Sequence, residues 1–324
     1  MKRPQLDALT AHSLLLGGAM LCSHAANILF HGLTGRRLPD ADYATWVALF
    51  SLLQLTALPA QSYALSVARE VARCPQITRP LLRRECARFL ILTPLLLLLW
   101  PLRGFLPLTT PAALLFLSST LLLGALLGLA GGILQGQQRF AWLAGRSLLL
   151  FPGRFLLVWL LFARLTPSLN AVMAAHALAT LLALGLSGAG IRLPAPAVPL
   201  PRLWRPALKI FPALFAFSVL LTADVLLARH LFDPTLSAPY ARAAVIARMI
   251  LWLPLPVAQA LFPKLLAPAE TASRHQRQAL RFTNLLLLSA WLGCLLFAPL
   301  GLRILFGAEA ADPDTVRWLR TLAT

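Results

Sequence analysis

Long apolar stretches recur along the whole chain, and their length is the property that most constrains its fold. Nine of them approach or exceed the roughly 20 residues that a helix needs to cross a hydrocarbon core about 30 Å thick. Backbone amides in lipid must be hydrogen-bonded within their own segment, which favours helices for such runs. Charged residues make up 12% of the sequence and fall largely between the stretches. The sequence therefore predicts an all-α, polytopic transmembrane helical bundle.

We predict nine full spans and the start of a tenth. The nine cover Leu9–Leu33, Tyr43–Ala68, Phe89–Leu106, Ala112–Leu134, Ser147–Phe162, Leu169–Leu186, Ile210–Ala228, Ala241–Pro263 and Phe282–Leu300. Asp312 followed by Pro313 is typical of an N-cap and the first residue of a helix, which opens the tenth. Because that helix barely begins before residue 324, the sequence predicts a truncated second lobe.

Lysine and arginine are unevenly distributed between alternate loops. If the N-terminus is cytoplasmic, the cytoplasmic loops carry most of the 29 lysines and arginines, as the positive-inside rule expects. Basic loops that face anionic lipid also account for the net charge of +18. No basic stretch is interleaved with aromatic residues, so we expect the lipid bilayer, and no nucleic acid, as the partner of these charges.

One proline-rich interruption divides the chain. Five prolines fall within Gly190–Pro206, which excludes a continuous helix and favours an extended linker. We therefore predict an N-terminal six-helix lobe at 1–189, a cytoplasmic linker at 190–209 and an incomplete C-terminal lobe at 210–324. The second lobe resembles a weak copy of the first shifted by 197 residues, so that Asn27 corresponds to Asp224. Both copies have the same predicted orientation, as in a parallel repeat.

Charged residues inside the spans are the first candidates for function. Arg154 lies near the middle of the fifth span, where an arginine costs roughly 2.5–3.5 kcal/mol and needs a partner or a cavity. It either holds an anionic substrate or binds carbonyls that Pro152 leaves free in the preceding turn. Asp224 and Arg248 lie on consecutive predicted spans at similar depth, so they form either a structural ion pair or a site for substrate or a coupling ion.

Polar stripes on the first two spans indicate either a hydrated cavity or contacts that hold helices together. His24, Asn27 and His31 recur on one face of the first span, and Ser51, Gln54 and Gln61 recur on the second. A lone His176 in the sixth span indicates a packed histidine. The candidate substrate-binding residues of a predicted cavity are Arg154, Arg248, Asp224, His24, Asn27, Gln54 and Gln61.

Several chemical features are missing from the sequence. The first six predicted spans contain no Asp or Glu, so the embedded charge is mostly positive and favours an anionic ligand. The four cysteines form no CxxC pair, and we expect neither a disulfide nor a metal site. No catalytic arrangement or phosphate-binding glycine loop is present, so we expect no enzymatic activity and no cofactor.

Four segments together resemble a known superfamily. They are Arg37–Tyr43 before the second span, Gly131–Phe140 after the fourth, Tyr240–Pro263 in the eighth and Ile304–Gly307 after the ninth. In order and spacing they resemble the multidrug/oligosaccharidyl-lipid/polysaccharide exporter superfamily, in particular its polysaccharide and lipid-linked oligosaccharide flippases of the O-antigen and lipid II type.

This resemblance implies two six-helix lobes around a central cavity that opens alternately to each side of the bacterial inner membrane. It implies undecaprenyl-diphosphate-linked oligosaccharides as cargo and polysaccharide polymerases or glycosyltransferases as partners. Arg154 and Arg248 are then the residues expected to bind the diphosphate. Two other functions stay open at this point: a small-molecule (drug) exporter of the same fold, and an inactive scaffold in a polysaccharide assembly complex.

Overall fold

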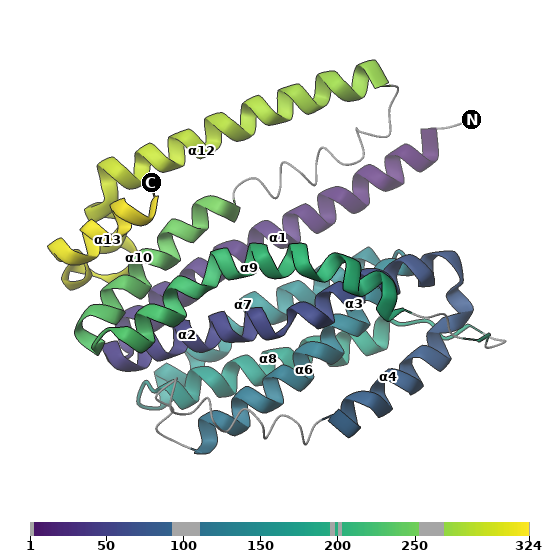
Figure 1. The fold of residues 1–324 in the computed structure, drawn as a ribbon, viewed down its shortest axis with the longest axis horizontal. Coiled ribbons are helices and arrows are strands. Elements are labelled where there is room, and N and C mark those ends of the chain that lie inside the picture. Colours follow the sequence, from purple (N-terminus) through teal and green to yellow (C-terminus); the bar gives the residue numbers. More distant parts are fainter. Residues whose placement is uncertain (1–2, 93–110, 195–197, 200–202, 253–268, 324) are drawn as a thin grey trace.

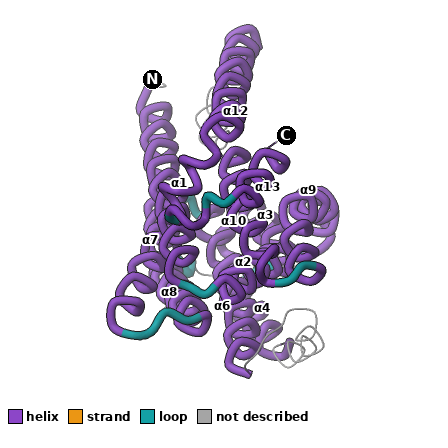
Figure 2. Tube along the Cα trace, turned by 90° about the vertical axis from the view of Figure 1, so that its left-hand side faces the viewer, coloured by secondary structure: helices purple, strands orange, loops and turns teal. Residues whose placement is uncertain are grey.

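The computed structural model describes residues 3–92, 111–194, 198–199, 203–252 and 269–323, and every regular element in these ranges is a helix (Figure 1). The all-α prediction is thus confirmed. The long helices run roughly along the longest axis, and α12 and α4 lie at opposite edges in both views (Figures 1 and 2). The helices are α1 (Arg3–Arg37), α2 (Asp40–Thr56), α3 (Leu58–Arg73), α4 (Thr78–Leu92), α6 (Pro111–Gly136), α7 (Phe140–Arg164), α8 (Leu169–Gly190), α9 (Trp204–Leu231), α10 (Pro234–Trp252), α12 (Ala269–Phe306) and α13 (Pro313–Ala323), with short 3₁₀ turns at Pro75–Ile77 and Ala308–Ala310.

Within the described residues, α6, α7, α8, α9 and α12 are each long and apolar enough to cross a membrane, and α2 with α3 makes a sixth crossing if the bent pair is one span. The first predicted span, Leu9–Leu33, is helical throughout but is not among them. Parts of the third and eighth predicted spans, residues 93–106 and 253–263, lie outside the described residues.

The second predicted span, Tyr43–Ala68, is not one helix. It breaks at Ala57, and α2 and α3 are bent by 41° at this point. Pro59 stands in the first turn of α3, where a proline is well tolerated because the amides of that turn lack helical partners in any case. The predicted span therefore corresponds to a bent pair of helices, in which Pro59 begins the second.

Helix α12 extends well beyond the predicted span Phe282–Leu300 and contains a break. Phe297 has non-helical backbone angles (φ −113°, ψ 20°), two residues before Pro299. Pro299 has no amide hydrogen to give to the carbonyl of Leu295, one helical turn earlier. The Nε of Arg320 in α13 donates to that carbonyl at 3.1 Å. Asp312 caps α13, since its carboxylate accepts the Thr315 amide at 2.9 Å, and the predicted start of this helix is confirmed.

Three glycines of α6 lie against α3. Gly128, Gly132 and Gly136 face Ala60, Ala64 and Ala68, each one turn further along. A Cβ at Gly136 would lie 2.6 Å from the Ala68 carbonyl oxygen, so the two backbones are in direct contact there. The four-residue glycine spacing thus serves close helix packing in this part of α6.

The N-terminal helices α1–α8 and the C-terminal helices α9–α13 are linked at one end by a set of polar contacts, and we name this end the joined end. It comprises the last turns of α1, α9 and α12, the first turns of α2 and the first half of α10. Arg36 donates to the carbonyls of Ile304 and Leu305, which have no helical partners at the end of α12. Arg242 pairs with Asp40 and also donates to the Gly35 carbonyl. Arg242 therefore joins the two sets of helices.

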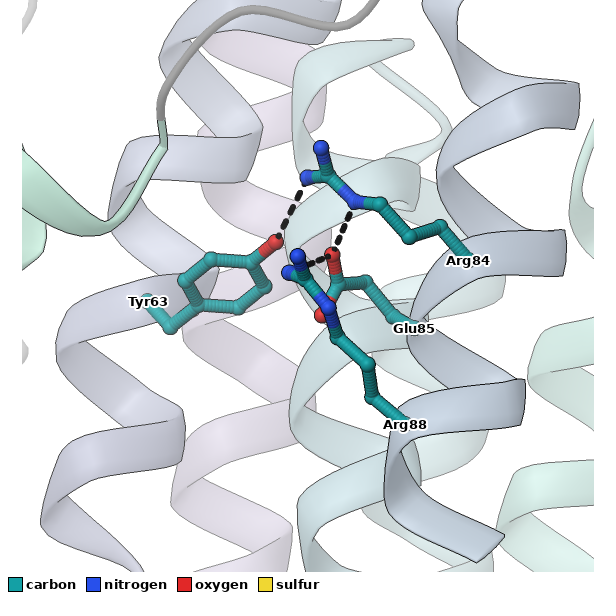
Figure 3. Close-up of polar contacts among 4 residues, drawn as sticks. All are labelled: Tyr63, Arg84, Glu85 and Arg88. Atoms are coloured by element: carbon teal, nitrogen blue, oxygen red, sulfur yellow. Dashed lines mark hydrogen bonds and ion pairs between the residues drawn. The ribbon is translucent and has the colours of Figure 1, made fainter. Parts of the chain in front are cut away.

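A second polar cluster fixes α4 to α3 (Figure 3). The Glu85 carboxylate is buried and accepts from Arg84 at 2.7 Å and from Arg88 at 3.0 Å. Arg84 also reaches the Tyr63 hydroxyl at 3.5 Å. The Tyr63 ring stacks on Trp204, the first residue of α9, with 4.4 Å between centroids. The cluster therefore connects α4, through α3, to the beginning of the C-terminal helices.

We expect Glu85→Gln to lower the free energy of unfolding by roughly 1–3 kcal/mol, because two charge-assisted hydrogen bonds lose their carboxylate. The measurement is thermal unfolding of purified protein in detergent. The matched control is Glu70→Gln, because Glu70 is 23% exposed where Glu85 is 1% exposed and its partner Arg73 is 60% exposed, so this pair is expected to contribute roughly 0–1 kcal/mol. Equal melting temperatures for the two variants would show that the Glu85 cluster contributes no more than a surface pair.

Candidate functional site

A cavity of about 360 Å³ lies between the N-terminal and the C-terminal helices. Helices α1 and α2 supply one side of it, and α9, α10 and α12 supply the other. The volume falls in the range of small-molecule sites. The lining residues are Leu21, His24, Asn27, Ile28, His31, Val47, Phe50, Ser51, Gln54, Leu221, Val245, Arg248, Met249, Phe282 and Leu286.

The polar groups of the wall follow the helical repeat. His24, Asn27 and His31 lie on one face of α1, and Ser51 and Gln54 lie one turn apart on α2. The described residues of the opposite wall are apolar except for Arg248. No carboxylate lines this described wall, so its only formal charge at neutral pH is positive. The cavity combines a hydrogen-bonding side, an apolar side and one guanidinium.

Arg248 forms an ion pair with Asp224, which does not line the cavity. Its Nη2 donates to one oxygen of Asp224, and the Tyr240 hydroxyl donates to the other at 3.0 Å. The predicted meeting of Asp224 and Arg248 is therefore observed. The side chains of Arg248 and Asp224 retain 19% and 32% of their exposure, so the pair is not sealed inside the bundle. An anion in the cavity would thus compete with Asp224 for the guanidinium.

Arg154 lies behind the cavity wall and does not line it. Its side chain is 1% exposed, donates to the Asn27 side-chain oxygen, and lies 3.2 Å from Nδ1 of His176. Arginine has no acceptor, so Nδ1 of His176 accepts this bond. The guanidinium carbon lies 4.0 Å from the centre of the Phe30 ring and 5.1 Å from that of Phe50. No described carboxylate forms an ion pair with Arg154.

This arrangement differs from both roles expected for Arg154. The guanidinium neither faces the cavity nor binds a carbonyl freed by Pro152; it binds side chains of α1 and α8. Asn27 and Phe50, however, both contact Arg154 and line the cavity. Arg154 therefore supports two wall residues from behind. His176 is packed as expected, edge-on against Trp46 and Phe50.

Among the other candidates, His24, Asn27, Gln54 and Arg248 line the cavity, and Asp224 lies beside it, bound to Arg248. Gln61 does not belong to the wall: it follows the bend at Ala57 and its side chain is exposed. The candidate set omitted Ser51 and His31, which line the wall and belonged to the same two stripes. It also missed Tyr240, which stood out in the sequence only as the first residue of the segment Tyr240–Pro263.

In the described part of the chain, no three or more His, Cys, Asp or Glu side chains lie close enough together to hold a metal ion. The cavity therefore offers its ligand hydrogen bonds, apolar contact and one shared positive charge.

Comparison with known proteins gives a match at the level of structure. No protein-family model matches the sequence, and no curated protein matches it. The crystal structure of the eukaryotic MATE transporter AtDTX14 is similar to this chain, with a TM-score of 0.53 and 16% sequence identity over 98% of this chain and 78% of that one. At this identity the likeness establishes the fold alone. The helices are arranged as in that MATE transporter.

Proposed function

We propose that this protein is a multi-pass bacterial inner-membrane transporter that moves lipid-linked oligosaccharide precursors, with an undecaprenyl diphosphate anchor, across the bilayer by alternating access. The observation that carries the proposal is the cavity wall. It presents hydrogen-bonding side chains on α1 and α2 opposite an apolar surface with the guanidinium of Arg248. A diphosphate needs cationic and donor groups, a sugar needs hydrogen bonds, and an isoprenoid chain needs apolar contact.

The joined end supports alternating access. Arg36, Arg242 and Arg229 all make their bonds across the boundary between the two sets of helices, with Arg229 donating to Thr45 at 3.0 and 3.1 Å. These polar contacts lie beside apolar ones, such as the Tyr43–Phe306 ring contact with 5.9 Å between centroids, so opening this end requires both kinds of contact to separate. The proposed orientation, with a cytoplasmic N-terminus, would place the joined end on the outer side.

The direct experiment uses the purified 324-residue chain in proteoliposomes that contain a short-chain polyprenyl-diphosphate sugar. Movement between leaflets is followed by periodate oxidation of sugars that reach the outer leaflet. The expected result is faster oxidation than in liposomes without protein. The corresponding polyprenyl alcohol, which lacks the diphosphate and the sugar, is the negative control and should not bind. Binding without movement would favour the scaffold function and contradict transport.

A second candidate is export of apolar small molecules. It is favoured by the many apolar side chains in the wall, among them Val47, Phe50, Met249 and Phe282. Uptake of an uncharged lipophilic dye into the same proteoliposomes distinguishes the candidates, because an exporter of apolar small molecules should carry such a dye and a site that requires a diphosphate should not.

Neutralising Arg248 and neutralising Asp224 should change the affinity for anionic cargo in opposite directions. Arg248→Gln removes the guanidinium and is expected to weaken binding of the diphosphate probe about tenfold or more, the scale of a charge-assisted hydrogen bond. Asp224→Asn releases Arg248 from its carboxylate and is expected to strengthen binding several-fold. The dissociation constant is measured by probe fluorescence in nanodiscs.

The control for Asp224→Asn is Asp314→Asn, which removes a negative charge from an exposed position of α13. A weaker affinity in Asp224→Asn would show that binding needs the intact ion pair. It would contradict the idea that the cargo anion competes with Asp224 for Arg248.

A further inference from the structure

His31 occupies an unusual position in the cavity wall. It lies on α1 and is 4% exposed, yet it belongs to the lining. Within the described residues its Nδ1 atom has no hydrogen-bond partner. The ring is held edge-on by Tyr43 and Phe50, with centroids 6.5 and 6.2 Å away. A buried imidazole nitrogen without a partner, at the edge of a cavity, can bind a proton or a ligand.

The groups around His31 are predominantly cationic. Arg248 shares the cavity wall with it, and Arg154 lies against Phe30 and Phe50, the same rings that contact His31. Asp224 is the acidic group of this neighbourhood, and it is already bound by Arg248 and Tyr240. Among the described residues, these contacts connect His31 to the following titratable and charged groups. Tyr43 on α2 packs against its ring, Arg154 on α7 and His176 on α8 contact Phe50, and His24 on α1 and Arg248 on α10 share the cavity wall. Asp224 on α9 and Tyr240 on α10 belong to the group bound to Arg248.

An empty cavity therefore opposes protonation of His31. A second positive charge would be placed beside two guanidinium groups in a site largely withdrawn from water. An anion in the cavity reverses this balance, because its negative charge offsets the guanidinium groups and gives the protonated ring an acceptor. A doubly charged diphosphate is the ligand class for which the change is largest.

We propose that His31 takes up a proton when an anionic cargo enters the cavity, so that cargo binding and protonation are coupled. The inference rests on the proposed function, since it requires a negatively charged cargo. The proton binds at the vacant imidazole nitrogen, after which both ring nitrogens are donors and one donates to a phosphate oxygen.

Neither of the two neighbouring histidines is expected to replace His31. His176 already uses Nδ1 to accept from Arg154, so a further proton there would face the guanidinium directly. His24 lies two helical turns from His31 in the same wall and serves as the matched control.

The coupling has a definite sign. The complex holds more protons than its separated components, so affinity for the anion falls as the pH rises. Uptake of one proton corresponds to at most a tenfold loss of affinity for each pH unit. The probe is a short-chain polyprenyl-diphosphate sugar, whose diphosphate diester keeps a constant charge over the range tested, so any slope comes from the protein.

The experiment measures the dissociation constant of this probe in nanodiscs between about pH 5.5 and pH 8. Calorimetry in two buffers of different ionisation enthalpy gives the number of protons taken up by the unmodified protein, which needs no variant. We expect wild type and His24→Asn to take up between a fraction of a proton and one proton when the probe binds. For His31→Asn we expect an affinity that does not change with pH.

Each outcome decides a different point. Binding of the probe with no proton uptake overturns the coupling and leaves the proposed function standing. No binding at any pH overturns both. A flat profile for His24→Asn with a retained slope for His31→Asn assigns the proton to His24 and overturns the choice of His31.

Discussion

Replacing Gly132 with alanine is expected to destabilise the protein markedly. The added Cβ would fall against the carbonyl oxygen of Ala64 on α3, with the Ala64 carbonyl carbon and Cα each 3.0 Å away. All three are backbone atoms, so no side chain can rotate to make room, and α3 must move as a whole. Overpacking of this kind costs roughly 1–3 kcal/mol, and a substitution to leucine should prevent folding.

The matched control is Gly124→Ala, two turns earlier on α6, where a Cβ would meet nothing within 4 Å. Alanine is the better helix former by about 1 kcal/mol, so this variant should be neutral or more stable. Thermal unfolding in detergent compares the two. If both variants melt at the same temperature, the close approach of α6 and α3 contributes nothing to stability.

Replacing Arg154 with methionine is expected to abolish transport while leaving the protein folded. Asn27 would lose its donor, and the guanidinium beneath Phe30 and Phe50 would disappear, so the cavity wall would lose support from α7. The free energy of unfolding should change little. Arg154 is a buried charge without a carboxylate partner, so the substitution loses its hydrogen bonds but also removes the free-energy cost of burying the charge. We expect a reduction of cargo movement by at least about tenfold, with a melting temperature within a few degrees of wild type.

The control is Arg146→Met on the same helix. Arg146 donates to the Leu127 carbonyl at 2.8 Å and does not belong to the cavity lining. Its loss should leave cargo affinity unchanged. Normal transport by a well-folded Arg154→Met variant would show that the support of Asn27 and Phe50 is irrelevant to cargo movement. Transport and binding are measured in the proteoliposomes and nanodiscs described above.

Helical periodicity predicted much of one cavity wall. Three residues spaced along one face of α1 must point the same way, and the structure places His24, Asn27 and His31 in the lining. The same reasoning failed for Gln61, because it assumes a straight helix. The bend at Ala57 separates Gln61 from Ser51 and Gln54 and leaves its side chain exposed.

Partners across helices were harder to predict. Asp224 and Arg248 could be paired from the sequence because their depths matched and their charges were opposite. Arg154 could not be paired, since its partners are a neutral amide, a histidine nitrogen and aromatic rings from three other helices. The joined end was also invisible, because Arg36 binds backbone carbonyls of α12, which every residue possesses.

The break in α12 has a mechanical consequence. In lipid, a carbonyl without a partner costs several kcal/mol, and Arg320 on α13 relieves that cost at Leu295. The bend in α12 and the docking of α13 are therefore linked, because α13 supplies the hydrogen bond that the break leaves unmade. If the part of α12 beyond Pro299 moves, α13 must move with it, or the Leu295 carbonyl loses its hydrogen bond. The end of α12 and α13 should therefore move as one rigid unit.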